Sequence, residues 1–381
     1  MKRNIPDGLS IYLDLVRLAA AFIVLLTHVW PFLFPQHPLP WPGHSAVVIF
    51  FVLSGFVISH AARPDLGLHG YALHRIARIY PVVLAAALLS IAIASAGIPN
   101  IINYGSPRGS DWQDIGVNLA FLGQSWTDVA MPYVGTLWSL DYEIWYYILF
   151  GLWCYYRSLP LLACAALVAG PKILLLMPVW LLGVVLHRKM VPLKPRYALS
   201  LFVVSLAAGL AFFWFDAGIR IREAMRVVSP WLIQVTQGSN QFVGDFILGL
   251  IVALNFLAAG SLGMKPTLKF KTVIRYLSSF TFSLYVFHLP LAVILWNGLH
   301  VRSAPVFFGL LMAGVWILGT LTERRTSWYR SKLSKIWPDK NKAAVHDPLP
   351  VDAAGGDEHR PAGHAATGVD LAKQPRERLA S

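Results

Sequence analysis

The sequence predicts an all-α fold, a polytopic transmembrane helical bundle of about ten helices. Three observations predict this fold class. Hydrophobic residues make up 56% of the 381 residues and charged residues only 13%. The mean hydropathy is +0.56. Apolar stretches recur along the chain, and most approach the roughly 20 residues that cross a bilayer. A chain of this composition is not a soluble globular protein.

The apolar stretches give the expected helices in chain order. They lie at residues 10–34, 44–62, 80–97, 134–156, 159–170, 173–187, 197–215, 242–262, 277–297 and 304–322. Gly170, Pro171 and Lys172 interrupt the stretch from 159 to 187, so the sequence leaves open two short helices or one broken helix.

The basic residues predict the orientation, because lysine and arginine are enriched in cytoplasmic loops. With the N-terminus inside, ten crossings place every basic cluster inside, whereas nine crossings leave the last three clusters outside. We therefore expect ten crossings with both termini cytoplasmic. The composition is also consistent with the inner membrane of a Gram-negative bacterium. The same bias explains the net charge of +13 without a nucleic-acid partner. The clusters are Arg63 with Arg75 and Arg78, then Arg157, then Arg188 to Arg196, then Lys265 to Arg275, and Arg324 to Lys335.

The first span is expected to be a retained helix. Lys2 and Arg3 precede an apolar stretch, as they would in a signal peptide. However, Asp7, Asp14 and Arg17 interrupt the region, and no small-x-small cleavage site follows it.

The C-terminal residues differ in composition from the rest. From residue 338 the chain is rich in Ala, Gly, Pro, His and charges, which cannot bury a core. We expect residues 1–330 to form the transmembrane domain and residues 331–381 a disordered cytoplasmic tail. Cys154 and Cys164 both lie in apolar stretches, so the sequence shows no disulfide, thiol or metal signature.

Two ionisable residues in the first span are candidate functional residues. Arg17 and His28 are eleven residues apart, which is about three helical turns, so they share a face and differ by roughly 16 Å in depth. Ionisable side chains are costly in hydrocarbon and often mark function. The structural alternative for His28 is a core histidine that hydrogen-bonds a carbonyl.

A third ionisable residue, Glu143, lies on the span at 134–156. It shares a helix face with Ser139, whereas Asp141 points away from both. Glu143 is expected about two turns below the outer surface, where it could meet His28. A carboxylate beside an imidazole orients a general base. The alternative is a structural ion pair with an arginine.

Small and basic residues suggest where a ligand could enter the bundle. Ser54 and Gly55 allow close approach of another helix or of a slender ligand, and helix packing is the commoner cause. Arg75 and Arg78 immediately precede a helix that Pro81 can open, and such a pair can hold phosphates. The alternative for the arginines is ordinary anchoring at the cytoplasmic surface.

Two further features leave alternatives open. Pro290 frees a backbone acceptor two residues after His288, and irregular backbone at membrane depth usually lines a cavity. The outer segment 98–133 interleaves acids with aromatic rings, and the outer segment 31–44 is rich in proline and also carries aromatic rings. Such surfaces bind sugars, or form an interfacial aromatic belt, which is more common. The residues are Asp111, Asp114 and Asp128 with Tyr104, Trp112, Trp126 and Tyr133 in the first segment, and Phe32, Phe34 and Trp41 in the second. Asp245 lies near the outer end of a later span.

Five motifs in this order resemble the acyltransferase-3 family of membrane proteins, bacterial O-acyltransferases that modify glycans. The resemblance covers roughly residues 8–325. Asp141-Tyr142 and Ile144-Trp145 depart from common variants of the family, and we expect no hydrolase-like domain after the last span. The motifs are Arg-x10-His from Arg17, Phe-Phe-Val-Leu-Ser-Gly-Phe at 50–56, Arg-x-x-Arg-x-x-Pro at 75–81, Trp-Ser-Leu-x-x-Glu at 138–143 and Ser-x-Tyr-x-x-His-x-Pro at 283–290.

The resemblance implies an acyl-CoA-dependent O-acyltransferase of class EC 2.3.1. Its donor would be cytoplasmic acyl-CoA, most often acetyl-CoA, used as a substrate and not as a permanently bound cofactor. Its acceptor would be a hydroxyl of a cell-surface or exported glycan, such as exopolysaccharide or O-antigen, or of a lipid-linked saccharide. Membrane lipids would surround the helices.

The resemblance also suggests roles for particular residues. Arg75 and Arg78 would bind the donor phosphates, and the pantetheine arm would pass Ser54 and Arg17. His28, oriented by Glu143, would take the proton of the acceptor hydroxyl. Arg17 could also stabilise the oxyanion. Tyr285 and His288 would line the same cavity, in an acyl-carrying or positioning role.

Two other classes of protein remain compatible with the residues. Intramembrane His, Glu and Arg also form proton relays in secondary transporters, although the two halves of this chain show no clear repeat. A protein that only binds or flips a glycan would need His28 for folding alone.

Overall fold

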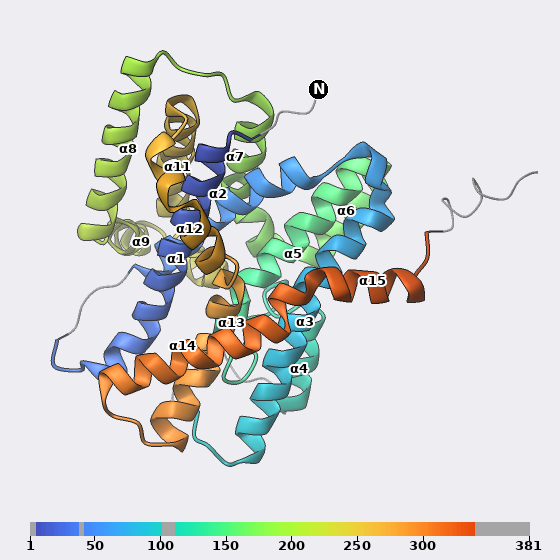
Figure 1. The fold of residues 1–381 in the computed structure, drawn as a ribbon, viewed down its shortest axis with the longest axis vertical. Coiled ribbons are helices and arrows are strands. Elements are labelled where there is room, and N and C mark those ends of the chain that lie inside the picture. The colour runs from blue at the N-terminus through green and yellow to red at the C-terminus, as the bar shows by residue number, and fades with distance from the viewer. Residues whose placement is uncertain (1–4, 38–41, 101–110, 340–381) are drawn as a thin grey trace, which may run out of the picture. The chain divides into compact units, whose positions relative to one another are not determined.

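The computed structural model describes residues 5–37, 42–100 and 111–339. These residues form helices joined by turns and loops, with no β-strand among them, which confirms the all-α class. The α-helices are α1 (Asp7–Leu33), α2 (Gly43–Ala61), α3 (Gly67–Ser95), α4 (Asp111–Leu119), α5 (Trp138–Gly151), α6 (Leu159–Ala169), α7 (Pro171–Lys189), α8 (Pro195–Trp214), α9 (Ala217–Val228), α10 (Pro230–Thr236), α11 (Phe242–Leu262), α12 (Lys271–Ser278), α13 (Thr281–Val293), α14 (Ala304–Leu321) and α15 (Thr326–Ile336) (Figure 1).

Eight helical segments in the described residues are long and apolar enough to cross a membrane. They confirm a polytopic membrane protein. The predicted spans at 134–156 and 159–170 correspond to α5 and α6, which are not among the eight. Helix α6 has 11 residues, and α5 has 14 and continues as a π-helix over Leu152–Tyr156. The crossing number and the cytoplasmic termini stay predictions. The eight segments are Asp7–Leu33, Gly43–Ala61, Pro64–Ser95, Pro171–Lys189, Pro195–Trp214, Phe242–Leu262, Thr281–Gly298 and Ala304–Ile336.

The interrupted stretch from 159 to 187 forms two separate helices. Gly170 joins α6 to α7 with a φ of 83°, which L side chains rarely adopt. A Cβ at this position would also overlap the carbonyl of Ser125. The backbone conformation and the close approach both require glycine at the junction.

Helix α3 begins earlier than predicted. The sequence placed Arg75 and Arg78 just before a span starting at residue 80, but α3 already begins at Gly67 and contains Pro81 in its interior. Tyr71 and Ala77 are buried, so packing holds the polar N-terminal part in the helix. Both arginines therefore lie on a continuous helix.

Helices α2 and α7 pack closely through glycines on both sides. A Cβ at Gly55 would overlap the carbonyl of Trp180, and a Cβ at Gly183 would overlap that of Val52. The structure thus supports helix packing as the reason for Gly55. The neighbouring Ser54 lines a cavity.

Helix α13 lies between α1 and α3 (Figure 1). Nearly all of its residues are buried, including His288 at 0% exposure. Pro290 lies inside the helix, which continues as a π-helix over Ile294–Gly298. This position brings Tyr285 and His288 between helices that are distant in sequence.

The predicted tail begins within a helix. Helix α15 covers Thr326–Ile336 and packs against α3, so residues 331–336 are helical and not disordered. A hydrogen bond of 2.9 Å from Nε2 of His69 on α3 to the Trp337 carbonyl continues this contact. Residues 340–381 lie outside the described part of the chain.

Candidate functional site

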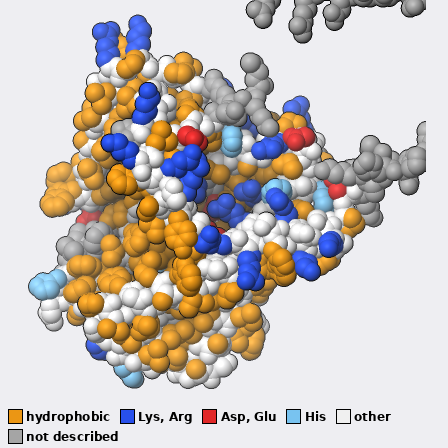
Figure 2. Space-filling view, in the orientation of Figure 1, with side chains coloured by type: hydrophobic (Ala, Val, Ile, Leu, Met, Phe, Trp, Pro, Cys, Tyr) orange, Lys and Arg blue, Asp and Glu red, His pale blue; other side chains and the backbone are white. Residues whose placement is uncertain are grey.

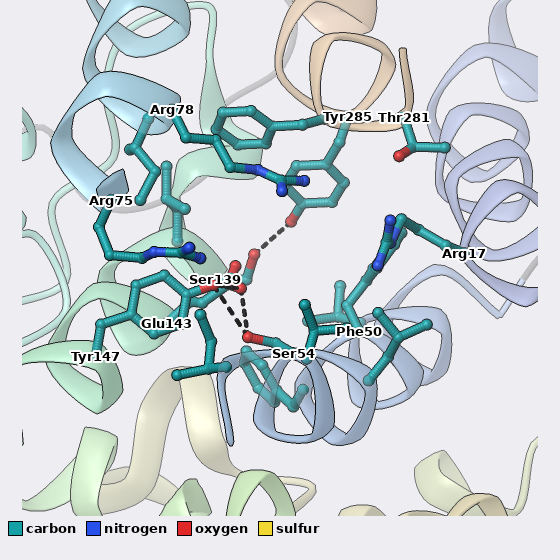
Figure 3. Close-up of a pocket in the computed structure, with 18 residues that line it drawn as sticks. Arg17, Phe50, Ser54, Arg75, Arg78, Ser139, Glu143, Tyr147, Thr281 and Tyr285 are labelled. Carbon is teal, nitrogen blue, oxygen red and sulfur yellow. Dashed lines mark hydrogen bonds between the residues drawn. The ribbon is translucent and has the colours of Figure 1, made fainter. Parts of the chain in front are cut away.

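Two cavities contain most of the predicted site residues. The first, here called the arginine cavity, holds six of them at positions contributed by five helices (Figure 3). These are Arg17 on α1, Ser54 on α2, Arg75 and Arg78 on α3, Glu143 on α5 and Tyr285 on α13. Ser139, Tyr147 and Thr281 also line it.

The arginine cavity has an excess of positive charge. Three guanidinium groups line it against one carboxylate, that of Glu143. Figure 3 shows Arg75 and Arg17 on opposite sides of Glu143. Arg17 binds Asp14 at 3.2 Å, whereas the Nε of Arg75 is buried without a hydrogen-bond partner in the described part of the chain. Such a site favours an anion, because a buried unpaired donor is costly.

Glu143 is held by two other side chains, one of which is held in turn by a third. The Ser54 hydroxyl donates to Glu143 Oε1 at 2.5 Å, and Tyr147 donates to the same oxygen. The indole N–H of Trp180 donates in turn to Ser54 Oγ at 3.1 Å. Tyr147 follows Glu143 by four residues on one helix face, a spacing that sequence reasoning could have used.

His28 and His288 form a hydrogen-bonded pair between α1 and α13. Nδ1 of His28 lies 3.0 Å from Nε2 of His288, and the two rings stack with centroids 5.1 Å apart. Nδ1 of His288 lies 2.8 Å from the Leu284 carbonyl, which can only accept. Neutral His288 therefore accepts at Nε2, so His28 donates from Nδ1 and its Nε2 carries the lone pair.

The predicted contact between His28 and Glu143 is wrong. The two residues line different cavities, and His288 takes the position beside His28 that was expected for the carboxylate. Depth along a helix can be estimated from sequence, but rotation toward a particular neighbour depends on packing. The predicted faces of α5 are nevertheless correct. Ser139 lines the arginine cavity with Glu143, and Asp141 points away to accept from the Gln124 backbone N–H at 2.9 Å.

The second cavity, here called the histidine cavity, is lined by His28 and by polar groups from α2, α5 and the preceding loop. They include His44, Gln124, Asp128, Thr136 and Trp138. Trp138 thus provides an aromatic wall, whereas Trp112 and Trp126, predicted in the outer segments, do not belong to this lining. The predicted Trp41 and Tyr104 lie outside the described residues.

The two cavities meet at Tyr285 and Val47, which line both. The Tyr285 hydroxyl donates to the Thr136 carbonyl at 2.9 Å and lies 2.5 Å from Ser139 Oγ. Tyr285 is 7% exposed and held from two elements, so its ring is fixed where the two cavities adjoin.

His44 was missed by the sequence analysis. Its Nε2 lies 3.0 Å and 3.2 Å from the two carboxylate oxygens of Asp245 on α11. Its position at the start of the second span, next to a proline-rich segment, gave no periodic signal. Asp245 was noted in the sequence without a partner.

The fold and its two cavities define a polytopic membrane protein with a buried polar site. The acyltransferase domain model of the acyltransferase 3 family matches residues 10–324, so the chain belongs to this family of membrane acyltransferases. It is 35% identical over 115 residues to acyltransferase MdmB of Streptomyces mycarofaciens, across 29% of this chain and 28% of that protein. No solved structure gives a significant match.

Proposed function

We propose that the protein transfers an acyl group, with acetyl the first candidate, from acyl-CoA to a hydroxyl of an exported or lipid-linked glycan. One observation carries this proposal. A cavity suited to an anionic donor meets a cavity that contains an imidazole base, and the two share the wall at Tyr285.

The arginine cavity would receive the donor. Arg75 and Arg78 lie one helical turn apart and both face it, so they could bind donor phosphates together. Figure 2 shows Lys and Arg side chains gathered around a hollow in a largely hydrophobic surface. Arg17 lines this cavity and not the other, which favours contact with the donor over stabilisation of an oxyanion beside His28.

The histidine cavity would receive the acceptor. Nε2 of His28 removes the proton of the acceptor hydroxyl while its oxygen attacks the thioester carbonyl. The C–S bond then breaks, CoA leaves as a thiolate that is protonated, and the acyl group remains as an O-ester. The step needs no further reactant.

His288 is a positioning residue in this account. It is completely buried and does not line either of the two cavities, so it supports His28 and does not carry the acyl group. Glu143 would act on the donor side by fixing Ser54 and Tyr147.

The test is the ester content of surface polysaccharide, measured by proton NMR before and after mild base. Cells would carry wild type, His28→Ala or the control His37→Ala at matched membrane levels. His37 is exposed beyond the end of α1. We expect base-labile acyl signals with wild type and the control and none with His28→Ala. Full acylation by His28→Ala would refute the assigned base. No ester with wild type would refute this acceptor class and turn attention to transport.

A further inference from the structure

The histidine cavity contains a second imidazole with its own carboxylate. His44 lies at the start of α2 and Asp245 in the first turn of α11, and they are paired at 3.0 Å. The mechanism above uses neither residue. His44 is partly exposed to the cavity, with a side-chain exposure of 25%, whereas Asp245 has 5%.

The backbone places the His44 imidazole beside α1, the helix that carries His28. A Cβ on Gly43 would lie 2.7 Å from the Thr27 hydroxyl, so α1 and α2 are in close contact there. His28 and His44 are the next residues on the two helices, and both line the histidine cavity. Two imidazoles from adjacent helices therefore face one ligand space.

The ring of His44 is fixed on two sides. It stacks on Trp138 with centroids 5.7 Å apart and an interplanar angle of 5°. The Asp245 carboxylate can only accept, so Nε2–H of His44 donates to it. This bond orients the ring and so fixes the position of the other ring nitrogen, Nδ1. A carboxylate orients a catalytic or metal-bound imidazole in the same way.

The same cavity contains buried acceptors without partners. Gln124 Oε1 and Thr136 Oγ1 make no hydrogen bond within the described part of the chain, and both residues are 2% exposed. The Gln124 amide nitrogen is already used, since it donates to Asp128 at 2.7 Å. Because unsatisfied buried acceptors are costly, they indicate a ligand that brings several donors, as a polyhydroxylated molecule does.

We propose that His44 is the acceptor-positioning residue. Its Nδ1 hydrogen-bonds one hydroxyl of a polyhydroxylated acceptor, Gln124 and Thr136 bind others, and this arrangement selects the hydroxyl that reaches His28. The inference rests on the proposed function and extends it to acceptor recognition and regiochemistry.

The test separates acceptor from donor effects. Membranes carrying the full chain at matched levels receive radiolabelled acetyl-CoA and, as acceptor, polysaccharide from the expressing cells that mild base has de-esterified. His44→Phe keeps a ring against Trp138 but loses the hydrogen bonds. His44→Gln keeps a hydrogen-bonding group. Asp245→Asn keeps an acceptor without charge. His37→Ala is the control.

For His44→Phe we expect the half-saturating polysaccharide concentration to rise about tenfold, the loss of one good hydrogen bond. The half-saturating acetyl-CoA concentration stays within about twofold of wild type, and NMR shows the ester redistributed among hydroxyls. His44→Gln recovers part of the affinity for polysaccharide. Asp245→Asn also raises the half-saturating polysaccharide concentration. If His44→Phe does not fold, the other two variants decide.

Unchanged acceptor saturation and ester position, with transfer still lost in His28→Ala, would overturn the role of His44 while leaving the proposed function intact. Equal changes in the half-saturating concentrations of acetyl-CoA and polysaccharide would indicate a structural role for His44. This result would also overturn its role in positioning the acceptor. No ester with wild type would refute the proposed function, and with it this inference.

Discussion

Nδ1 of His28 lies 3.0 Å from Nε2 of His288, across the contact between α1 and α13. The Leu284 carbonyl fixes the tautomer of His288, which in turn fixes that of His28. The proposed base, His28, is therefore oriented by a buried imidazole and a backbone carbonyl, with no carboxylate in this chain of bonds.

Replacing His288 by Ala should lower the transfer rate about 100-fold without weakening acyl-CoA binding. The variant leaves His28 in place but removes the acceptor of its Nδ1–H. His288→Gln should recover part of the rate, because an amide can accept from His28 and donate to Leu284. Initial rates at saturating donor and calorimetric binding of CoA test this. A parallel loss of CoA affinity would contradict a positioning role.

Changing Arg75 and Arg78 together to Ala should raise the Kd for CoA at least about 100-fold, since two charge-assisted contacts to phosphate are lost. The salt dependence of binding should also weaken. Arg196→Ala is the control, because Arg196 lies in the first turn of α8 and does not line the arginine cavity. Titration of CoA onto detergent-solubilised protein measures both quantities. Unchanged binding by the double variant would remove the donor site from this cavity.

Glu143→Ala should lower the free energy of unfolding by about 1–3 kcal/mol, because the buried hydroxyls of Ser54 and Tyr147 lose their common acceptor. Glu143→Gln should restore part of the loss, since its amide oxygen can still accept. Thermal unfolding in detergent, read from tryptophan fluorescence, gives the comparison. Equal stability of all three proteins would show that this network is not formed.

Gly55→Ala should destabilise the protein by about 1–3 kcal/mol, because its Cβ would overlap the Trp180 carbonyl on α7. Gly309→Ala is the matched control on α14, where a Cβ meets nothing within 4 Å. There alanine should be neutral or stabilising through helix propensity. The same thermal measurement applies, and a normal melting temperature for Gly55→Ala would contradict the close packing of α2 on α7.

The sequence was most informative where hydropathy alone decides. The span predicted at 242–262 matches α11, Phe242–Leu262, and the first span at 10–34 nearly matches α1, Asp7–Leu33. It was least informative where polar residues occur inside a helix. The start of α3 was missed because His74 and the arginines interrupt its apolar pattern, although packing buries the intervening Tyr71 and Ala77.

In the site, too, some features could be predicted from the sequence and others could not. Helical spacing correctly placed Glu143 and Ser139 on one face of α5, and it correctly placed Asp141 pointing away from both. It could not say which helix Glu143 would face, so the partner assigned to His28 was wrong. Arg17 and His28 were predicted three helical turns apart on one face, and each lines a different cavity. Contacts between helices depend on rotation and tilt, which one sequence does not specify.

We propose direct transfer from acyl-CoA to a glycan hydroxyl with His28 as base. The measurement that tests it uses purified protein in lipid nanodiscs, acetyl-CoA labelled in the acetyl group, and de-esterified polysaccharide. It counts free CoA released and base-labile label bound to polysaccharide. We expect one CoA for each ester with wild type and His37→Ala, and neither product with His28→Ala. Ester formation that persists in His28→Ala, or no transfer by a wild-type protein that binds acetyl-CoA, would contradict it.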